Sequence, residues 1–266
     1  MIDQGKKSVL GVMVDAVDYD GALSRIARAA HERRPYIVSA LAVHGVMTGV
    51  ESAEHKFRLN SFDLIVPDGQ PVRWALNLVH RSALASRVYG PELTLRTLGM
   101  AEREGLPVYF YGTRHAILSR LLERIAIDFP KLIVAGAEPS KFRTLHPEEC
   151  VALATRIKDS GAAITFAGLG CPRQEVFAYE MRPLLPMPIL AVGAAFAFIA
   201  GTLSQAPPSM QRHGLEWLYR LREEPLRLWR RYLILNPYYL FLLAAQLVGV
   251  NYRTMGKAPV TQIRYG

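Results

Sequence analysis

The sequence predicts an α/β fold with a mostly parallel sheet and helices on both faces. Up to about residue 200, short apolar runs alternate with segments of helical periodicity, a pattern typical of βαβ units. The runs are apolar at nearly every position, as in strands that are covered on both faces. After Ala206-Pro207 no strand is evident, and a basic, aromatic segment follows. We therefore expect one α/β domain over residues 1–206 and a helical appendage over residues 207–266.

The individual elements follow from the same periodicity. The predicted strands lie at residues 9–14, 36–40, 64–66, 108–111, 132–135, 163–167 and 189–192. The predicted helices lie near residues 20–32, 45–60, 71–79, 92–104, 115–128, 147–159 and 174–182. In the appendage we expect a helix over 215–235, a break at Asn236-Pro237, and an apolar run over 238–250.

Charge and cysteine content narrow the functional classes. The net charge is +9, and residues 207–266 contribute +6 of it, with nine Lys or Arg against three Asp or Glu. Such a basic tail suits an anionic membrane or a nucleic acid. The two cysteines form no CxxC pair and no disulfide framework, which fits a reducing cytoplasm. The N-terminal residues show no secretory signal pattern.

Several strand ends carry residues suited to chemistry, because ligands of doubly wound sheets bind at the carboxyl ends of the strands. Asp68, between Pro67 and Gly69, could take a proton from an attacking hydroxyl; the alternative is a turn residue that caps the next helix. The candidate substrate-binding residues at these strand ends are Ser39, His44, Gly69, Gly112, Gly168, Gly170, Arg173 and Gln174.

Two of these candidates also have plain structural interpretations. The Gly168–Gly170 loop could hold a diphosphate at the start of the following helix, or it could be a tight turn followed by a solvated Arg173. His44 could bind a ligand, or it could pack or cap at a strand–helix junction.

Metal binding is not expected. Asp18-Tyr19-Asp20 has the form of a DxD metal motif, but it opens a helix, where Asp is a routine N-cap. No HExxH motif or Cys/His cluster is present elsewhere in the sequence. We therefore predict no metal and no cofactor.

Together, these motifs resemble the WecG/TagA/CpsF family of glycosyltransferases (glycosyltransferase family 26), over roughly residues 9–235. The first matching stretches are Asp63-Leu64-Ile65-Val66-Pro67-Asp68-Gly69, Arg87-Val88-Tyr89-Gly90, and Gly168-Leu169-Gly170-Cys171-Pro172-Arg173-Gln174-Glu175. The later ones are Val192-Gly193-Ala194-Ala195-Phe196, Ala200-Gly201, Ala206-Pro207, Gly214-Leu215-Glu216-Trp217-Leu218-Tyr219-Arg220-Leu221 and Glu224-Pro225-Leu226-Arg227-Leu228-Trp229-Arg230-Arg231-Tyr232.

The resemblance implies a Rossmann-like catalytic core and an inverting transferase. The donor would be a UDP-sugar, often UDP-N-acetylmannosamine, and the acceptor a polyprenyl-diphosphate-linked sugar of bacterial cell-surface polysaccharide synthesis. Asp68 matches the family's proposed base, and Gln174 matches its donor-pocket glutamine. Arg87, Arg220, Arg227 and Arg230 match arginines tied to activity.

One position departs from the family pattern. The family's Thr-x-Asn element after the second predicted strand corresponds here to Ser39 and Leu41, so the hydroxyl is kept and the amide is lost. An asparagine there could read sugar hydroxyls or an N-acetyl group. A glucosyl donor is therefore an alternative to N-acetylmannosamine.

The composition of the appendage predicts membrane association. Five arginines alternate with Trp217, Tyr219, Trp229 and Tyr232, a combination suited to lipid headgroups; the alternative is an ordinary amphipathic helix packed on the core. The run over 238–250 is shorter than the ~20 residues of a membrane span. We expect a peripheral or monotopic protein on the cytoplasmic face of the membrane, with an anionic membrane surface as partner and the homo-oligomer left open.

Two other functional classes are alternatives for this sequence. A nucleotide-dependent oxidoreductase would need GxGxxG after its first strand, and the first predicted strand ends in Val14-Asp15-Ala16-Val17-Asp18, without glycines. A non-catalytic membrane- or nucleic-acid-binding module would explain the basic tail, but it would have no need of Asp68. We expect no nucleic-acid partner.

Overall fold

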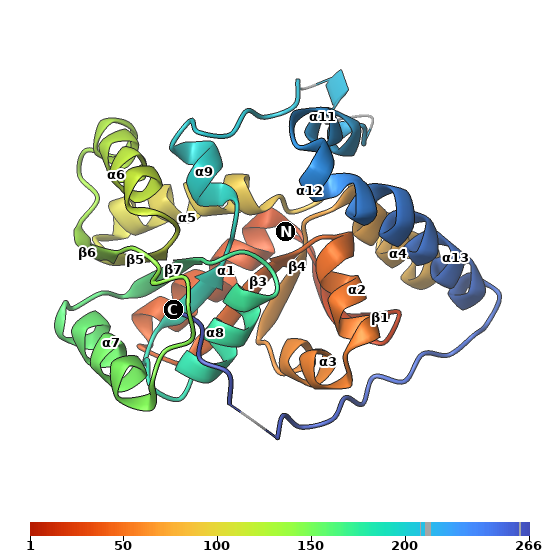
Figure 1. Ribbon diagram of the computed structural model, residues 1–266, viewed down its shortest axis with the longest axis horizontal. Helices are drawn as coiled ribbons and strands as arrows, with labels where there is room; N and C mark the ends of the chain where they lie inside the picture. The colour runs from red at the N-terminus through yellow and green to blue at the C-terminus, as the bar shows by residue number, and fades with distance from the viewer. Residues whose placement is uncertain (208, 211–213, 261) are drawn as a thin grey trace.

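The computed structural model describes residues 1–207, 209–210, 214–260 and 262–266, without the side chain of Arg227. Its central feature is a six-stranded sheet in the order β4-β3-β8-β7-β5-β6 (Figure 1). Every strand pair in this sheet is parallel. Its strands are β3 (Tyr36–Leu41), β4 (Leu64–Pro67), β5 (Val108–Gly112), β6 (Val134–Glu138), β7 (Ile164–Gly168) and β8 (Pro188–Ala191). The α/β class and the parallel sheet predicted from the sequence are confirmed.

The predicted strand at 9–14 is wrong, because this segment contains a hairpin turn. Strands β1 (Asp3–Val9) and β2 (Val12–Val17) pair antiparallel in a separate two-stranded sheet. Leu10 and Gly11 form the turn, with φ of 53° and 85°, as two-residue hairpin turns require. The apolar run hides the turn because Val9, Leu10 and Val12 are all buried in the core.

Helices cover both faces of the sheet, as predicted. One face carries α1 (Tyr19–His31), α5 (Gly90–Glu104), α6 (His115–Asp128) and α9 (Ala195–Ile199). The other carries α2 (Val43–Glu51), α3 (Ala53–Asn60), α4 (Gln70–His80), α7 (Pro147–Asp159) and α8 (Arg173–Met181). Each face buries its own apolar cluster, so the strands are covered on both sides.

Two helix starts show the local chemistry. Asp18 is the N-cap of α1, and its Oδ1 accepts a hydrogen bond of 2.9 Å from the Gly21 amide, which confirms the cap interpretation of Asp18-Tyr19-Asp20. The predicted helix at 45–60 is two helices, because Ser52 leaves helical geometry and caps α3 by accepting from the His55 amide at 3.2 Å.

The C-terminal part is helical and packs on the α/β core. It contains α11 (Glu216–Glu223), α12 (Pro225–Arg230), the π-helical turn η1 (Arg231–Leu235) and α13 (Asn236–Leu247). The helix is interrupted at Glu224, and the interruption predicted at Asn236-Pro237 is absent. The Asn236 amide instead donates to the Arg231 carbonyl, and this wider turn lets the helix continue into Pro237.

Helix α13 lies beside α4 and α2 (Figure 1). Tyr239 and Leu243 are buried in the same cluster as residues of β2, α2 and α4. Beyond α13, the chain runs back along the core, where the Lys257 amide donates to the Ala53 carbonyl at 2.9 Å. Within the described ranges, no helix combines the length and apolar character needed to cross a bilayer.

Candidate functional site

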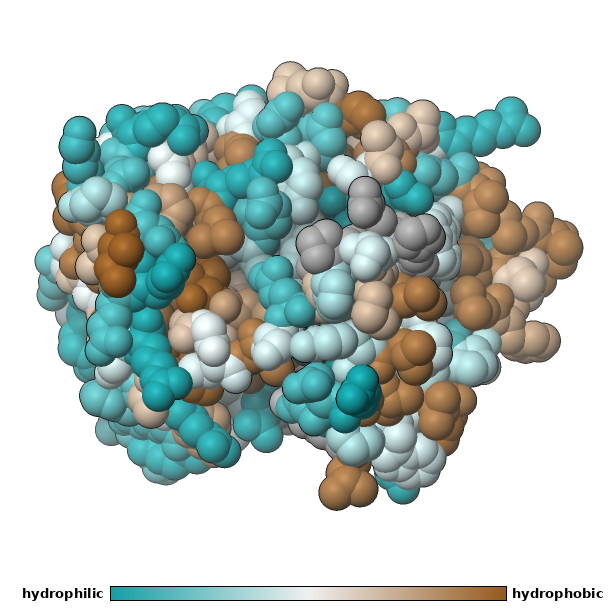
Figure 2. Space-filling model, turned by 90° about the horizontal axis from the view of Figure 1, so that it is seen from above, coloured by the Kyte–Doolittle hydropathy of each residue, from teal (hydrophilic) through white to brown (hydrophobic). Residues whose placement is uncertain are grey.

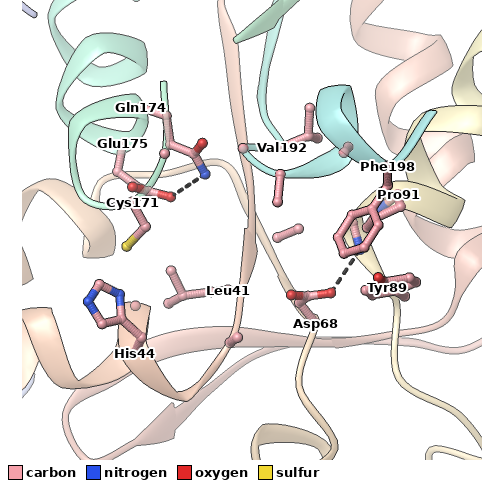
Figure 3. Close-up of a pocket in the computed structure, with 18 of the residues that line it drawn as sticks. Leu41, His44, Asp68, Tyr89, Pro91, Cys171, Gln174, Glu175, Val192 and Phe198 are labelled. Atoms are coloured by element: carbon pink, nitrogen blue, oxygen red, sulfur yellow. Dashed lines mark hydrogen bonds between the residues drawn. The ribbon is translucent and has the colours of Figure 1, made fainter. Parts of the chain in front are cut away.

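Five of the predicted site residues line a cavity of about 440 Å³ at the carboxyl edge of the parallel sheet, here called the main cavity. The loops after β3, β4, β7 and β8 line it, together with α11, α12 and η1. Figure 3 shows Asp68 on one side of this space and Gln174 and Glu175 on another. This edge is where a doubly wound sheet presents ligands.

Asp68 follows β4 directly and is half-buried. Its Oδ1 accepts a hydrogen bond of 2.8 Å from the Gly90 amide (Figure 3). Burial raises the pKa of the Asp68 carboxyl, and the Arg87 guanidinium and the Gly90 amide partly offset that rise. A carboxylate in this environment is a stronger proton acceptor than an exposed one, while its second oxygen stays available to a substrate.

Gln174 and Glu175 begin α8 and form a buried polar network. The Gln174 amide donates to Glu175 Oε1 at 2.9 Å and to the Ala191 carbonyl at 3.2 Å. Ser39 donates to the same Glu175 oxygen at 3.0 Å. Gln174 Oε1 and Glu175 Oε2 are buried without a hydrogen-bond partner. Both residues line the main cavity, so these two oxygens are suited to accept from a ligand.

Ser39 therefore does not line the main cavity, but contacts Glu175, which does. Its side chain is fully buried and holds Glu175 in place. Leu41 lines the cavity instead, and it does so where the family pattern has an amide. Burial raises the pKa of Glu175, so its protonated form, which can also donate a hydrogen bond, is favoured relative to an exposed glutamate.

His44 lines the main cavity near the start of α2 (Figure 3). Burial, and secondly the charge of Arg231, lower the pKa of its imidazole to about 4. The ring is therefore neutral at physiological pH. Its Nδ1 is buried without a hydrogen-bond partner, which leaves a polar atom that a ligand can satisfy.

The C-terminal helices bring two cations to the cavity. Arg220 of α11 and Arg231 of η1 both line it. Among the described residues, no carboxylate lies within ion-pair distance of either. Arg220 Nε is buried and unpaired. Buried cations without an anionic partner are costly, so a bound anion would stabilise this arrangement.

The other predicted arginines lie elsewhere. Arg87 is ion-paired with Glu216 and stacks on Tyr89, with 4.4 Å from its guanidinium carbon to the ring centroid. It does not line the main cavity, but its charge acts on Asp68. Arg230 is exposed and lies over Trp229. The side chain of Arg227 is outside the described part of the structure.

The predicted glycine-rich loops divide between two cavities. Gly170 lines the main cavity. Gly168 and Arg173 line a separate cavity of about 90 Å³ with Tyr265, whose ring centroid lies 5.7 Å from the Arg173 guanidinium carbon. Arg173, although next to Gln174 in the chain, does not line the main cavity. Gly112 pairs with Gly168, and a side chain at Gly112 would meet the Gly168 backbone at 2.7 Å.

A third cavity, of about 110 Å³, adjoins the main one and is here called the side cavity. Asp68, His44, Tyr89, Arg220 and Arg231 line both. Gly69, which was predicted to bind substrate, lines only the side cavity. Asp68 thus stands on the wall between two spaces.

Sequence reasoning did not assign Glu175, Tyr89, Phe198 or Arg231 to the site, although all of them line the main cavity. Arg231 had a usable signal, because it falls three residues after Leu228 and four before Leu235, on the stripe that faces the core. Leu228 is buried and Leu235 packs against the core cluster. Glu175 had a weaker signal, its place beside Gln174. Tyr89 lies at the N-cap of α5 and Phe198 in the five-residue helix α9, and neither position has a periodic pattern long enough to predict which way it faces.

No group of three or more His, Cys, Asp or Glu side chains in the described ranges is arranged to hold a metal ion.

Comparison with known proteins places this geometry in a family. The model of the "Glycosyl transferase WecG/TagA/CpsF family" matches residues 7–252. An N-acetylglucosaminyldiphosphoundecaprenol N-acetyl-beta-D-mannosaminyltransferase of Bacillus spizizenii is 31% identical over 190 residues, which cover 71% of each chain. Because the family match covers the parallel sheet, the cavity loops and the C-terminal helices alike, the chain belongs to the WecG/TagA/CpsF family of glycosyl transferases.

Proposed function

We propose that this protein is an inverting transferase that moves a sugar from a UDP-sugar onto the saccharide of a polyprenyl-diphosphate-linked acceptor. The observation that carries the proposal is the pairing of Asp68 with two arginines across one cavity. A carboxylate with a raised pKa serves as the base. Arginines without carboxylate partners stabilise the negative charge of the leaving diphosphate.

The proposed reaction is a single displacement at the anomeric carbon. The acceptor hydroxyl oxygen forms a bond to that carbon while the bond to the donor phosphate oxygen breaks. The Asp68 carboxylate takes the hydroxyl proton, and UDP leaves with the bonding electron pair. Attack from the face opposite the leaving group inverts the configuration.

Arg220 and Arg231 are the groups suited to the negative charge that develops on the diphosphate. Guanidinium groups bind phosphate oxygens through paired N–H donors. Backbone amides near Gly170 and the start of α8 add fixed dipoles at the same cavity. On this basis the transfer needs no metal ion and no cofactor.

The donor sugar is proposed from the polar atoms that the cavity leaves free. Gln174 Oε1 can accept from a sugar hydroxyl or from an N-acetyl N–H. The relative from Bacillus spizizenii is named as an N-acetylmannosaminyltransferase, which favours N-acetylmannosamine here. Leu41 supplies no amide to read the acetyl group, which favours glucose.

The acceptor is proposed to come from a membrane, at its cytoplasmic face. Helices α12 and α13 and the intervening η1 expose large apolar side chains at Leu226, Leu233, Ile234, Leu240 and Phe241. Figure 2 shows apolar side chains gathered at one end of the molecule, the end where Figure 1 has α13. An apolar face of this size beside arginines suits insertion into the headgroup region.

The test is UDP release from a panel of UDP-sugars with a short-chain, water-soluble polyprenyl-diphosphate-sugar acceptor. We expect acceptor-dependent release with UDP-N-acetylmannosamine or UDP-glucose, no loss in excess chelator, and a product of inverted anomeric configuration by NMR. Absence of transfer with every donor would overturn the proposal. A retained configuration would overturn the single-displacement mechanism, and chelator-sensitive activity would overturn metal independence.

A further inference from the structure

The side cavity is a built site that the reaction above leaves without an occupant. It lies between α4 and the C-terminal helices, and its lining outside the main cavity includes Gln70, Arg87, Glu216, Trp217 and Tyr232. We propose that it binds the acceptor saccharide, so that donor and acceptor reach Asp68 from opposite sides. The inference rests on the proposed function and names the place of its second substrate.

The position of Asp68 gives the first argument. A base in a displacement must touch the acceptor hydroxyl, and that hydroxyl must lie on the far side of the anomeric carbon from the leaving group. Asp68 lines both cavities, as do Arg220 and Arg231. With the donor in the larger main cavity, the side cavity is the adjoining space from which a hydroxyl can reach both Asp68 and the sugar.

The lining chemistry gives the second argument. The rings of Trp217 and Tyr232 lie with their centroids 6.0 Å apart at an interplanar angle of 50°. Both line the side cavity, and neither lines the main one. Aromatic faces with a few placed polar groups are typical of sites for small organic ligands. The apolar C–H face of a pyranose fits such a surface.

An unsatisfied polar atom gives the third argument. Gln70 begins α4, and its Oε1 is buried without a hydrogen-bond partner. Buried acceptors of this kind cost free energy unless a partner is present. A sugar hydroxyl or an acetamido N–H supplies the missing donor. The side cavity thus pairs a stacking surface with a hydrogen-bond acceptor and lies next to the base.

The location gives the fourth argument. Tyr232 and Asn236 connect the side cavity to η1 and α13, which carry the exposed apolar side chains at Leu233, Ile234, Leu240 and Phe241. A saccharide held here leaves its lipid chain beside the face proposed to enter the membrane. No comparable apolar face among the described residues borders the cavity lined by Tyr265.

The experiment separates acceptor binding from donor binding. Kinetics with the water-soluble acceptor give KM for each substrate, and calorimetry gives the affinity for UDP. We expect Trp217→Ala and Gln70→Leu each to raise the acceptor KM about tenfold, the scale of one lost ligand contact. The donor KM and the UDP affinity should stay within twofold of the wild type.

Matched variants guard against a folding artefact. Trp229→Ala removes a tryptophan from the same helical region, but Trp229 lines neither cavity, and the acceptor KM should be unchanged. Trp217→Phe keeps an aromatic face and should recover part of the affinity. If Trp217→Ala fails to fold, Gln70→Leu and Trp217→Phe supply the measurement.

The inference would be overturned by an unchanged acceptor KM in Gln70→Leu and the Trp217 variants, or by a loss of donor affinity equal to the loss of acceptor affinity. In either case, transfer by the wild type would still support the proposed function. A wild-type protein without transfer would overturn the proposed function itself. The two failures are therefore distinguishable.

Discussion

Asp68 is subject to opposing influences on its charge. Burial favours the protonated carboxyl, while Arg87 and the Gly90 amide favour the carboxylate. Arg87 is held in place by Glu216 and by the Tyr89 ring. The base, its cation and the C-terminal helices are thus coupled through two side-chain contacts, and a change at any of them should alter the basicity of Asp68.

The first prediction is the effect of Asp68→Asn. The amide keeps the shape and can still pair with the protein, but it cannot take a proton. We expect turnover to fall by about 100-fold or more, the usual scale for a positioned base, with UDP affinity unchanged. Steady-state kinetics and calorimetry measure the two quantities. Turnover within threefold of the wild type would remove Asp68 from its assigned role.

The second prediction concerns pH. The base must be ionised, so kcat should rise with pH through the pKa of Asp68 and level off above it. Because burial raises this pKa, the rising limb should lie above the ordinary Asp value of about 4. Asp68→Glu, which keeps a carboxyl, should retain a limb, while the residual activity of Asp68→Asn should lack it. A limb that persists in Asp68→Asn belongs to another group.

At the scale of elements, the rotational phase of the helix at the junction of α12 and η1 decides which arginine faces the cavity. Arg230 and Arg231 are neighbours in sequence, but Arg230 is exposed over Trp229 and Arg231 lines both cavities. Successive side chains of a helix point about 100° apart, and here this separates Arg230 from Arg231. The resemblance pointed to Arg230, and the geometry favours Arg231.

The third prediction compares these neighbours on the water-soluble acceptor. Arg231→Ala should lower kcat/KM by about 100-fold, as when one donor to a developing oxyanion is removed. Arg230→Ala should change it far less. Arg231→Lys should recover only part of the loss, because the ammonium keeps the charge but not the paired N–H donors. The reverse ranking of the two alanine variants would return the role to Arg230.

At the scale of the whole molecule, α13 has two faces with separate tasks. Tyr239 and Leu243 are buried in the core cluster, and Tyr239 donates to the Pro71 carbonyl of α4 at 3.1 Å. Gln246 donates to the Ser8 carbonyl and accepts from the Leu10 amide, each at 3.0 Å. Leu240 and Phe241 are exposed, at 51% and 69%. The helix is therefore both part of the core and a candidate membrane contact.

The fourth prediction separates these tasks. Changing Leu240 and Phe241 together to Glu should lower the fraction of protein that floats with anionic liposomes. The midpoint of urea unfolding and the turnover on soluble acceptor should stay unchanged. Tyr239→Ala should instead lower the free energy of unfolding by about 3 kcal/mol or more, because it opens a cavity in the core. Undiminished flotation of the double variant would show that membrane contact lies elsewhere.

Features of the fold that depend on interactions between residues close together in the chain were the ones that the sequence predicted. Six of the predicted strands are present in the parallel sheet, because apolar runs and helical periodicity record local burial. The cap at Asp18 is likewise a local interaction between Asp18 and Gly21. The hairpin at Leu10 and Gly11 was missed because β1 is mostly polar and because Val9 and Leu10 extend the apolar run of β2 across the turn. The break predicted at Asn236-Pro237 is absent because a π-helical turn accommodates Pro237.

The sequence by itself determined the α/β class, the strand ends that carry Asp68 and Gln174, and the family resemblance, since each depends on residues close together in the chain. Only the tertiary structure decided which of them meet. It placed Ser39 behind Glu175, turned Arg173 toward Tyr265, and brought Arg231 beside Asp68. Those outcomes depend on helix phase and on how segments about ninety or more residues apart pack together, and no local pattern encodes them.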